Sequence, residues 1–369
     1  MADYSVYLNR WAKARKLMEK AGIGSLLLVP TTALFYLTAQ KGQINDRLSC
    51  FLLTASEAFF ICPGFEKPRV NKDLLLNSQS FVHSDGDDSC KMLADLIAEK
   101  GGSGLTAVDT RIWGGFLLSL QQRLPKQGWV DAAQIITPLR MQKDEEEYCL
   151  LKEAQRRAGL GLAEFYKWGL EGRSEKEAAL KFTEFLTQAG LEKSDWGPIV
   201  ASGPHSAIPH WSAGDRVIQK GDAVVLDFGG VYYGYQADMT RTPFIGKASE
   251  EFKEIHAVVL AANEAAFKAV KAGAPCESVD AAARAVITKA GYGAFFTHRL
   301  GHGIGLDEHE DPYMVAGNKQ PLAPGMSFSD EPGIYLPEKF GIRIEDILFL
   351  KEKEPERLTD FHHDLTELD

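Results

Sequence analysis

The segment from Arg299 to Glu310, RLGHGIGLDEHE, places two histidines, His302 and His309, among three glycines. A chain so rich in glycine has little tendency to hold regular structure, so two imidazole groups need another reason to be there. Imidazole is a common metal ligand and the side chain that most readily exchanges a proton near neutral pH. The segment is therefore a candidate for a metal or catalytic site whose partners come from elsewhere in the chain.

Four carboxylates stand in strand-like segments where apolar residues are expected. Asp227 ends the apolar run AVVLDFGG, and Asp238 follows in GYQADMTRT after a glycine-containing turn. If these two segments form a hairpin, both carboxylates can lie on one face. Glu331 in SDEPGIY and Glu345 in GIRIEDILFL repeat the pattern on two later segments that we expect to be strands. Like charges gathered in this way repel, so a cation is their natural partner.

Together with His302, these residues make an oxygen-rich set of donors with one nitrogen. Four negative ligands balance two divalent cations, whereas a single ion would leave an excess of buried charge. Such donors favour Mn²⁺ or Co²⁺, whereas a typical structural zinc site uses thiolates. Zn²⁺ is a third candidate. The sequence therefore predicts two divalent metal ions per subunit.

Two neighbouring divalent ions can activate water and polarise a carbonyl group, which is the machinery of hydrolysis. His210 in GPHSAIPHW and His309 are imidazoles that this ligand set does not need. We expect both to stabilise a substrate carbonyl or a tetrahedral intermediate.

The elements that position these residues fall into two expected domains. Residues 1–140 alternate short apolar runs with helical stretches, which indicates a small α/β domain. Residues 141–369 group long helices apart from antiparallel-looking strands, which indicates an α+β domain. Within it, Ser174 and Glu177 have the spacing of a capping box and predict a helix that starts at Ser174.

The bulk composition excludes several classes of partner. A net charge of -10 argues against binding to nucleic acid or to anionic lipid. The longest apolar runs are interrupted at Pro30 and Glu57, so no membrane span is expected. Five dispersed cysteines without CxxC spacing favour reduced thiols and a cytoplasmic location.

Six motifs occur in the order GPHSAIPH, VVLDFGG, ADMTRT, GHGIGLDEHE, EPGIY and GIRIED. In this order they resemble the metallopeptidases of the pita-bread fold, and most closely the proline-specific branch, Xaa-Pro dipeptidase (prolidase) and aminopeptidase P. The resemblance runs from about residue 140 to the end of the sequence. The first domain is similar, more loosely, to the creatinase-like N-terminal domain of these enzymes. The implied fold is a creatinase-like α/β domain followed by an α+β pita-bread catalytic domain.

The resemblance also implies how the metal ligands divide. Asp227 would bind one ion, and His302 and Glu331 would bind the other. Asp238 and Glu345 would bridge the pair.

Four residues match positions that the family uses in catalysis. Glu331 would be the acid–base partner of the water, and His210 and His309 fall at the two catalytic histidines. Arg343 falls where the family keeps an arginine two positions before the last ligand. On a strand that spacing returns to the same face, so Arg343 could support Asp227 or the substrate, or form an ordinary cross-strand ion pair.

Two positions depart from the family pattern. His205 stands where Asn is common, and Asp330 precedes Glu331 where an apolar residue is usual. We expect His205 to lie at a pocket rim or on the surface, and His298 to have a structural role or to support a metal ligand. The remaining histidines of the second domain are expected to be solvated: His256, His362 and His363.

The function implied by the resemblance is hydrolysis of peptides with proline at the second position. The resemblance also implies a homodimer, in which the first domain of one subunit leans towards the active site of the other. Three alternatives stay open. One is an aminopeptidase P that acts on longer peptides, although two domains rather than three favour the dipeptidase. Another is creatinase-like C–N hydrolysis, against which the full ligand set argues. The third is a binding protein on the same fold without activity.

Overall fold

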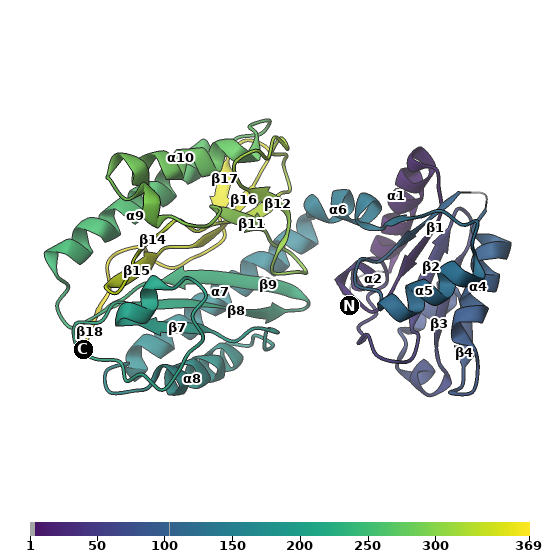
Figure 1. Cartoon of the computed structure of the whole chain (residues 1–369), viewed down its shortest axis with the longest axis horizontal. Coiled ribbons are helices and arrows are strands. Elements are labelled where there is room, and N and C mark those ends of the chain that lie inside the picture. The colour runs from purple at the N-terminus through teal and green to yellow at the C-terminus, as the bar shows by residue number, and fades with distance from the viewer. Residues whose placement is uncertain (1–3, 103) are drawn as a thin grey trace. The chain divides into compact units, whose positions relative to one another are not determined.

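The computed structural model describes residues 4–102 and 104–369. The chain divides into two compact units, Met1–Arg140 and Met141–Asp369 (Figure 1). Each unit contains its own hydrophobic core. None of the helices that the structure describes combines the length and hydropathy needed to cross a bilayer. All five cysteines are free thiols.

The first unit is built on a six-stranded mixed sheet with the strand order β4-β3-β2-β1-β5-β6. Its central strand β1 pairs antiparallel with β2 and parallel with β5, and its sequence IGSLLL is almost entirely buried, as expected for a strand covered on both faces. The elements are α1 (Ser5–Ala21), β1 (Ile23–Leu28), α2 (Thr32–Thr38), β2 (Cys50–Thr54), β3 (Ala58–Pro63), the 3-10 helix η1 (Gly64–Arg69), α3 (Lys72–Asn77), β4 (Gln79–His83), α4 (Ser89–Lys100), β5 (Leu105–Val108), α5 (Gly114–Arg123), β6 (Trp129–Asp131) and α6 (Ala133–Met141).

The second unit contains two pairs of helices, with one pair on each side of its strands (Figure 1). They are α7 (Glu145–Trp168), α8 (Glu175–Gln188), α9 (Glu250–Ala269) and α10 (Cys276–Lys289), with the 3-10 helices η2 (Gly203–Ala207) and η3 (Gly293–Phe295). The predicted capping box of α8 is confirmed, because the Glu177 amide donates to Ser174 Oγ at 3.2 Å and the Ser174 amide donates to Glu177 Oε2 at 2.9 Å.

The strands of this unit form one three-stranded sheet, β7-β8-β9, one five-stranded sheet, β12-β11-β13-β16-β17, and two small pairs, β14-β15 and β10-β18. Their bounds are β7 (Ile199–Ser202), β8 (Val224–Tyr232), β9 (Tyr235–Arg241), β10 (Phe244–Ile245), β11 (Gly301–Gly303), β12 (Glu310–Met314), β13 (Ser327–Asp330), β14 (Gly333–Leu336), β15 (Phe340–Arg343), β16 (Asp346–Leu350), β17 (Pro355–Arg357) and β18 (Glu367–Leu368). Helix α7 packs on β8 and β9, and α9 packs on β13, β14 and β15.

The predicted hairpin of the two aspartates is present as β8 and β9. Asp227 lies opposite Thr240, and Gly229 lies opposite Asp238. Residues directly opposite share a face, and so do residues two apart on one strand. Asp227 and Asp238 therefore lie on the same face, as the sequence predicted.

The segments around Glu331 and Glu345 differ from the single strands that we expected. The chain breaks after β13 at Glu331 and Pro332, and again between β15 and β16 at Ile344 and Glu345. At these breaks it passes between the five-stranded sheet, where β13 pairs with β16, and the separate β14-β15 pair. Pro332 has no N–H for a ladder, whereas the Glu345 amide donates to Thr240 O at 3.1 Å. Both glutamates thus lie at bends rather than within strands.

An aromatic stack ties the helices of this unit to the strand that carries Asp227. The rings of Phe165 on α7 and Phe182 on α8 lie 4.1 Å apart between centroids, and Phe182 and Phe228 on β8 lie 4.4 Å apart. All three side chains are fully buried. Because Phe228 follows Asp227 directly, the stack fixes the strand beneath the carboxylate.

We expect Phe182→Ala to destabilise this layer by about 3–5 kcal/mol, because it removes a buried ring and leaves a cavity. Hydrogen–deuterium exchange of the β8 amides measures that free energy locally. Leu180→Ala is the matched control, since Leu180 lies on the same helix but is 63% exposed. A loss no larger than that of the control would show that the stack does not hold β8.

Candidate metal centre

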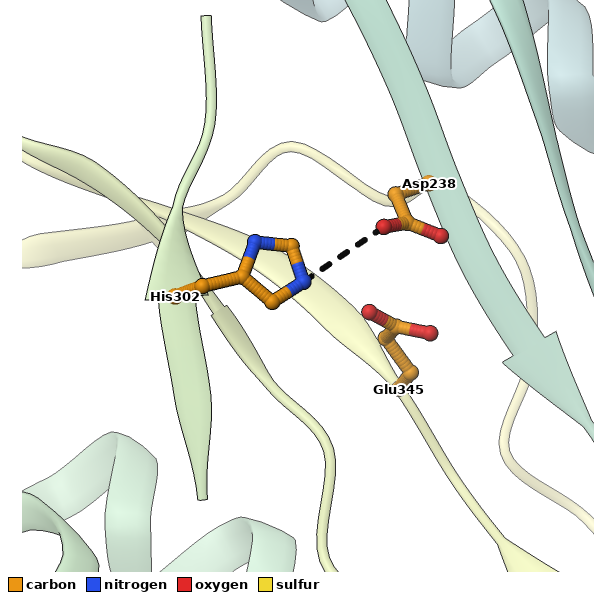
Figure 2. Close-up of side chains that lie close together, drawn as sticks. All are labelled: Asp238, His302 and Glu345. Atoms are coloured by element: carbon orange, nitrogen blue, oxygen red, sulfur yellow. Dashed lines mark ion pairs between the residues drawn. The ribbon is translucent and has the colours of Figure 1, made fainter. Parts of the chain in front are cut away.

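Asp238, His302 and Glu345 converge at one point in the second unit (Figure 2). One ligand atom from each lies within 4.8 Å of the others. They come from β9, from β11 and from the bend before β16, and their residues are only 2–3% exposed. Strands far apart in the sequence thus bring an imidazole and two carboxylates together away from solvent.

The imidazole of His302 is oriented as a metal ligand would be. Its Nδ1 lies 3.1 Å from Gly303 O, which can only accept, so Nδ1 carries the proton and Nε2 keeps its lone pair. Nε2 lies 3.7 Å from Asp238 Oδ2 and 3.4 Å from Glu331 Oε1. Burial and nearby His309 lower the pKa of His302 to about 3. The ring is therefore neutral, and its free nitrogen faces the carboxylates.

Glu331 lies beside this group, just beyond the end of β13. Ser329 Oγ donates to Glu331 Oε1 at 3.0 Å and accepts from the His302 amide at the same distance, so one hydroxyl links both residues. Burial raises the pKa of Glu331 to about 7, an effect that Arg343 opposes and Asp227 increases.

Asp227 is held by Arg343. The guanidinium donates from Nη2 to Asp227 Oδ2 at 2.6 Å and from Nη1 to the hydroxyl of Tyr335 at 2.8 Å, and Arg343 is 2% exposed. Of the partners expected from the sequence, Asp227 is the one that Arg343 contacts. This ion pair fixes the carboxylate in the wall of the cavity.

Thr240 is a site residue that sequence reasoning missed. Its hydroxyl donates to Glu345 Oε2 at 2.7 Å and accepts from Arg343 Nε at 3.1 Å. It lies two positions after Asp238 on β9, and therefore on the same face. That alternation in ADMTRT was the available signal.

The electrostatics of the group fit one or more bound cations. Burial raises the pKa values of Asp238 and Glu345 well above the ordinary range, and repulsion from the neighbouring carboxylates raises them further. Within the part of the chain that the structure describes, the buried atom Asp238 Oδ1 has no hydrogen-bond partner. A cation would relieve the repulsion and occupy that free oxygen.

A cavity of about 810 Å³ opens onto this group, and all five predicted ligands line it. His210 and His309 line it as well, and both are exposed. The ring of His309 lies 3.9 Å from that of His302 between centroids. Burial lowers the pKa of His309, and Arg299 adds to this effect. The two histidines thus stand at the solvent side of the cavity, outside the buried group.

His205 is half-buried and belongs to a network that supports the loop carrying His210. Its Nδ1 donates to Glu175 Oε1 at 2.9 Å, and its ring stacks on Trp211 with centroids 3.8 Å apart. Glu175 is fully buried and also accepts from Trp211 Nε1 at 2.9 Å and from the Ser202 amide at 2.9 Å. The departure at His205 thus adds an anchor for that loop.

The expectation that His256 and His363 are solvated is wrong. His256 is 7% exposed. His363 Nε2 lies 2.7 Å from Asp346 Oδ2, because Asp346 is a buried acid that attracts partners from the chain's last segment. His362 is exposed, as predicted. His298 bonds to the Tyr335 hydroxyl at 2.9 Å, which fits the structural role we expected.

Asp330, the other departure, is fully buried next to Glu331. In the described parts of the chain neither of its carboxylate oxygens has a hydrogen-bond partner. Burial raises its pKa well above the ordinary range, and Asp346, which lies opposite it on β16, adds to the rise.

Comparison with known proteins places this geometry in a family. Residues 149–352 match metallopeptidase family M24, and residues 10–142 match the creatinase/prolidase N-terminal domain. A probable dipeptidase PepE from Mycobacterium tuberculosis is 36% identical over an alignment of 371 positions, which covers 98% of this chain and 97% of the relative.

Solved structures agree with these matches. A crystal structure of a recombinant prolidase from Thermococcus sibiricus has a TM-score of 0.94 at 35% identity and covers 100% of both chains. An X-Pro aminopeptidase from Thermotoga maritima has a TM-score of 0.86 at 31% identity, covering 97% of this chain and 99% of the other. The predicted fold class and resemblance are confirmed. The chain belongs to metallopeptidase family M24, with a creatinase/prolidase N-terminal domain ahead of the catalytic domain.

Proposed function

We propose that this protein is a dinuclear metal-dependent peptidase that hydrolyses Xaa-Pro bonds, and that it acts as an Xaa-Pro dipeptidase. The observation that carries the proposal is the buried Asp238, His302 and Glu345 group at the base of a cavity of about 810 Å³. Its excess of buried negative charge needs cations, and the cavity admits a small peptide.

The proposed ligand division assigns Asp227 to one ion, His302 and Glu331 to the other, and Asp238 and Glu345 to both. Two findings support it: Asp238 and Glu345 belong to one compact group, and His302 Nε2 faces both Asp238 and Glu331. The predominance of oxygen favours Mn²⁺ or Co²⁺. When bound, such ions would activate water and polarise the scissile carbonyl.

The chain's own residues supply the remaining chemistry. Glu331, beside the group and fixed by Ser329, is placed to take a proton from the attacking water and return it to the leaving nitrogen. His210 and His309, on the solvent side, are placed to donate hydrogen bonds to the substrate carbonyl as its oxygen gains charge. Arg343 keeps Asp227 in its orientation.

Selectivity for proline follows from what the imide bond lacks. A bond to proline has no N–H, so the site must recognise the carbonyl, the ring or the terminal groups. The relatives include a named dipeptidase, a named prolidase and a named X-Pro aminopeptidase. Two domains rather than three favour the dipeptidase over an aminopeptidase P that acts on longer peptides.

The other functions are less well supported. Creatinase-like hydrolysis and a binding protein without activity do not account for five potential ligands gathered in one cavity. We also propose a cytoplasmic location, on the strength of five free cysteines.

Removal of metal should abolish activity, and Mn²⁺ or Co²⁺ should restore it best, because the proposed ligands are mostly carboxylates. The assay compares Ala-Pro, Ala-Pro-Gly and Ala-Ala after chelation and after reconstitution with each metal. Preference for Ala-Pro supports the dipeptidase, and preference for Ala-Pro-Gly supports aminopeptidase P. Full activity of metal-free protein would contradict the metal proposal, and equal rates on Ala-Ala would contradict the selectivity.

A contrast between two histidines tests the division of roles. His302→Ala should lose bound metal, because it removes the nitrogen ligand. His309→Ala should keep its metal while turnover falls by about 10²–10³-fold, as expected for loss of a group that stabilises developing charge. Metal content by atomic emission, measured beside kcat, separates the two effects. Equal loss of metal in both variants would show that the assignment is wrong.

The resemblance further leads us to propose a homodimer, in which the first domain of one subunit leans towards the active site of the other. Light scattering of the purified protein should give twice the mass of one chain. The mass of a single chain would refute this proposal.

A further inference from the structure

A fifth carboxylate, Glu308, lines the same cavity as the candidate metal ligands. It lies in the acidic end of the segment that carries His302 and His309, and its side chain is 32% exposed. The other four carboxylates of the cavity belong to the proposed set of metal ligands, and Asp227 also pairs with Arg343. Glu308 has no part in that set.

No cationic side chain of the cavity contacts Glu308 among the residues that the structure describes. Arg343 is bonded to Asp227 and Tyr335, and Arg299 directs Nη2 to His309 Nδ1 at 3.3 Å. The basic group nearest to Glu308 is His309, whose Nε2 lies 3.6 Å from Glu308 Oε1. That distance is too long for a hydrogen bond.

The charge of Glu308 is therefore poorly compensated by the protein. The nearest imidazole, His309, already accepts a hydrogen bond from Arg299. Burial and the charge of Asp227 raise the pKa of Glu308 to about 7. A half-buried carboxylate in this state gains most from a cation that comes from outside the chain.

The wall next to Glu308 contains the indole of Trp196. Its N–H is a weak donor to Glu308 and opposes the rise in the pKa of that carboxyl group. Its indole N–H has no hydrogen-bond partner of normal geometry within the described chain. The indole therefore compensates little of the charge of Glu308, and the carboxylate favours a basic group of the substrate over an acidic one.

We propose that Glu308 is a specificity-determining residue, which binds a cationic group on the first residue of the substrate. This inference rests on the proposed peptidase function. The cation has two sources. One is the basic side chain of an Arg or Lys at the first position, and the other is the free α-amine that every dipeptide carries.

Kinetics on matched substrates separate these sources. Citrulline has the shape of arginine without the charge, and propionyl-proline is Ala-Pro without the amine. If Glu308 binds the side chain, the wild-type protein prefers Arg-Pro to citrulline-Pro by about tenfold in kcat/KM, and Glu308→Gln removes that preference while Ala-Pro is unaffected. If Glu308 binds the α-amine, Glu308→Gln slows all three dipeptides by a common factor and leaves propionyl-proline unchanged.

Two results would overturn the proposal. One is that Glu308→Gln changes none of these rates. The other is that it slows propionyl-proline as much as the dipeptides, which would mean that Glu308 only positions His309. Asp195→Asn serves as the control for a general change in charge, because Asp195 is an exposed carboxylate next to Trp196. We expect this control to leave the preference intact.

Binding keeps this test independent of the proposed reaction. Calorimetry measures the affinity of the metal-loaded protein for arginine and citrulline without any turnover. If the Glu308→Gln variant binds arginine more weakly but citrulline equally well, the cation is the side chain. If it binds both arginine and citrulline more weakly, the cation is the α-amine. Unchanged binding of both refutes the proposal. If no Xaa-Pro peptide is cleaved but Glu308-dependent binding persists, the proposed function fails and the cation site stands.

Discussion

The structure of the second unit depends on negative charges that are buried together. Asp238, Glu331 and Glu345 surround His302, and Asp227 lines the same cavity. Like charges this close repel strongly in an environment of low polarity. The cation that the chain buries with them, Arg343, is bonded to Asp227. The arrangement is therefore stable as an ionised set only with further cations, and we regard the rest of the fold as the scaffold that keeps these groups in place.

Much of that scaffold is concentrated in the motif ADMTRT on β9. Thr240 faces the site and orients Glu345 and Arg343, whereas Arg241 points away from it. The Arg241 guanidinium donates to Glu345 O at 2.7 Å, to Asp346 Oδ1 at 2.9 Å and to Phe361 O at 2.9 Å. One strand thus holds the bend at Glu345 from both sides. The bend needs such support because neither β15 nor β16 includes it.

Sequence reasoning found the features that depend on short-range patterns. The capping box of α8 and the shared face of Asp227 and Asp238 follow from spacing within one element or one hairpin. The bends at Glu331 and Glu345 were missed because they arise from pairing between β13 and β16 and between β14 and β15. The same is true of Glu175 and His205, which are 30 positions apart, and of His363, which reaches Asp346 from the last segment. No local pattern records such contacts.

The glycines around His302 allow close packing of strands, whereas the sequence suggested that they prevent regular structure. They suggested a segment without regular structure, yet Gly301 and Gly303 flank His302 in β11, between β12 and β13. A Cβ atom at Gly301 would lie 2.0 Å from Ser329 O, and one at Gly303 would lie 2.4 Å from Asp311 O. Neither distance is sterically possible, so larger residues would push the neighbouring strands apart. Glycine allows the close packing that buries His302 among the carboxylates, whereas Glu308 and His309, beyond β11, line the cavity.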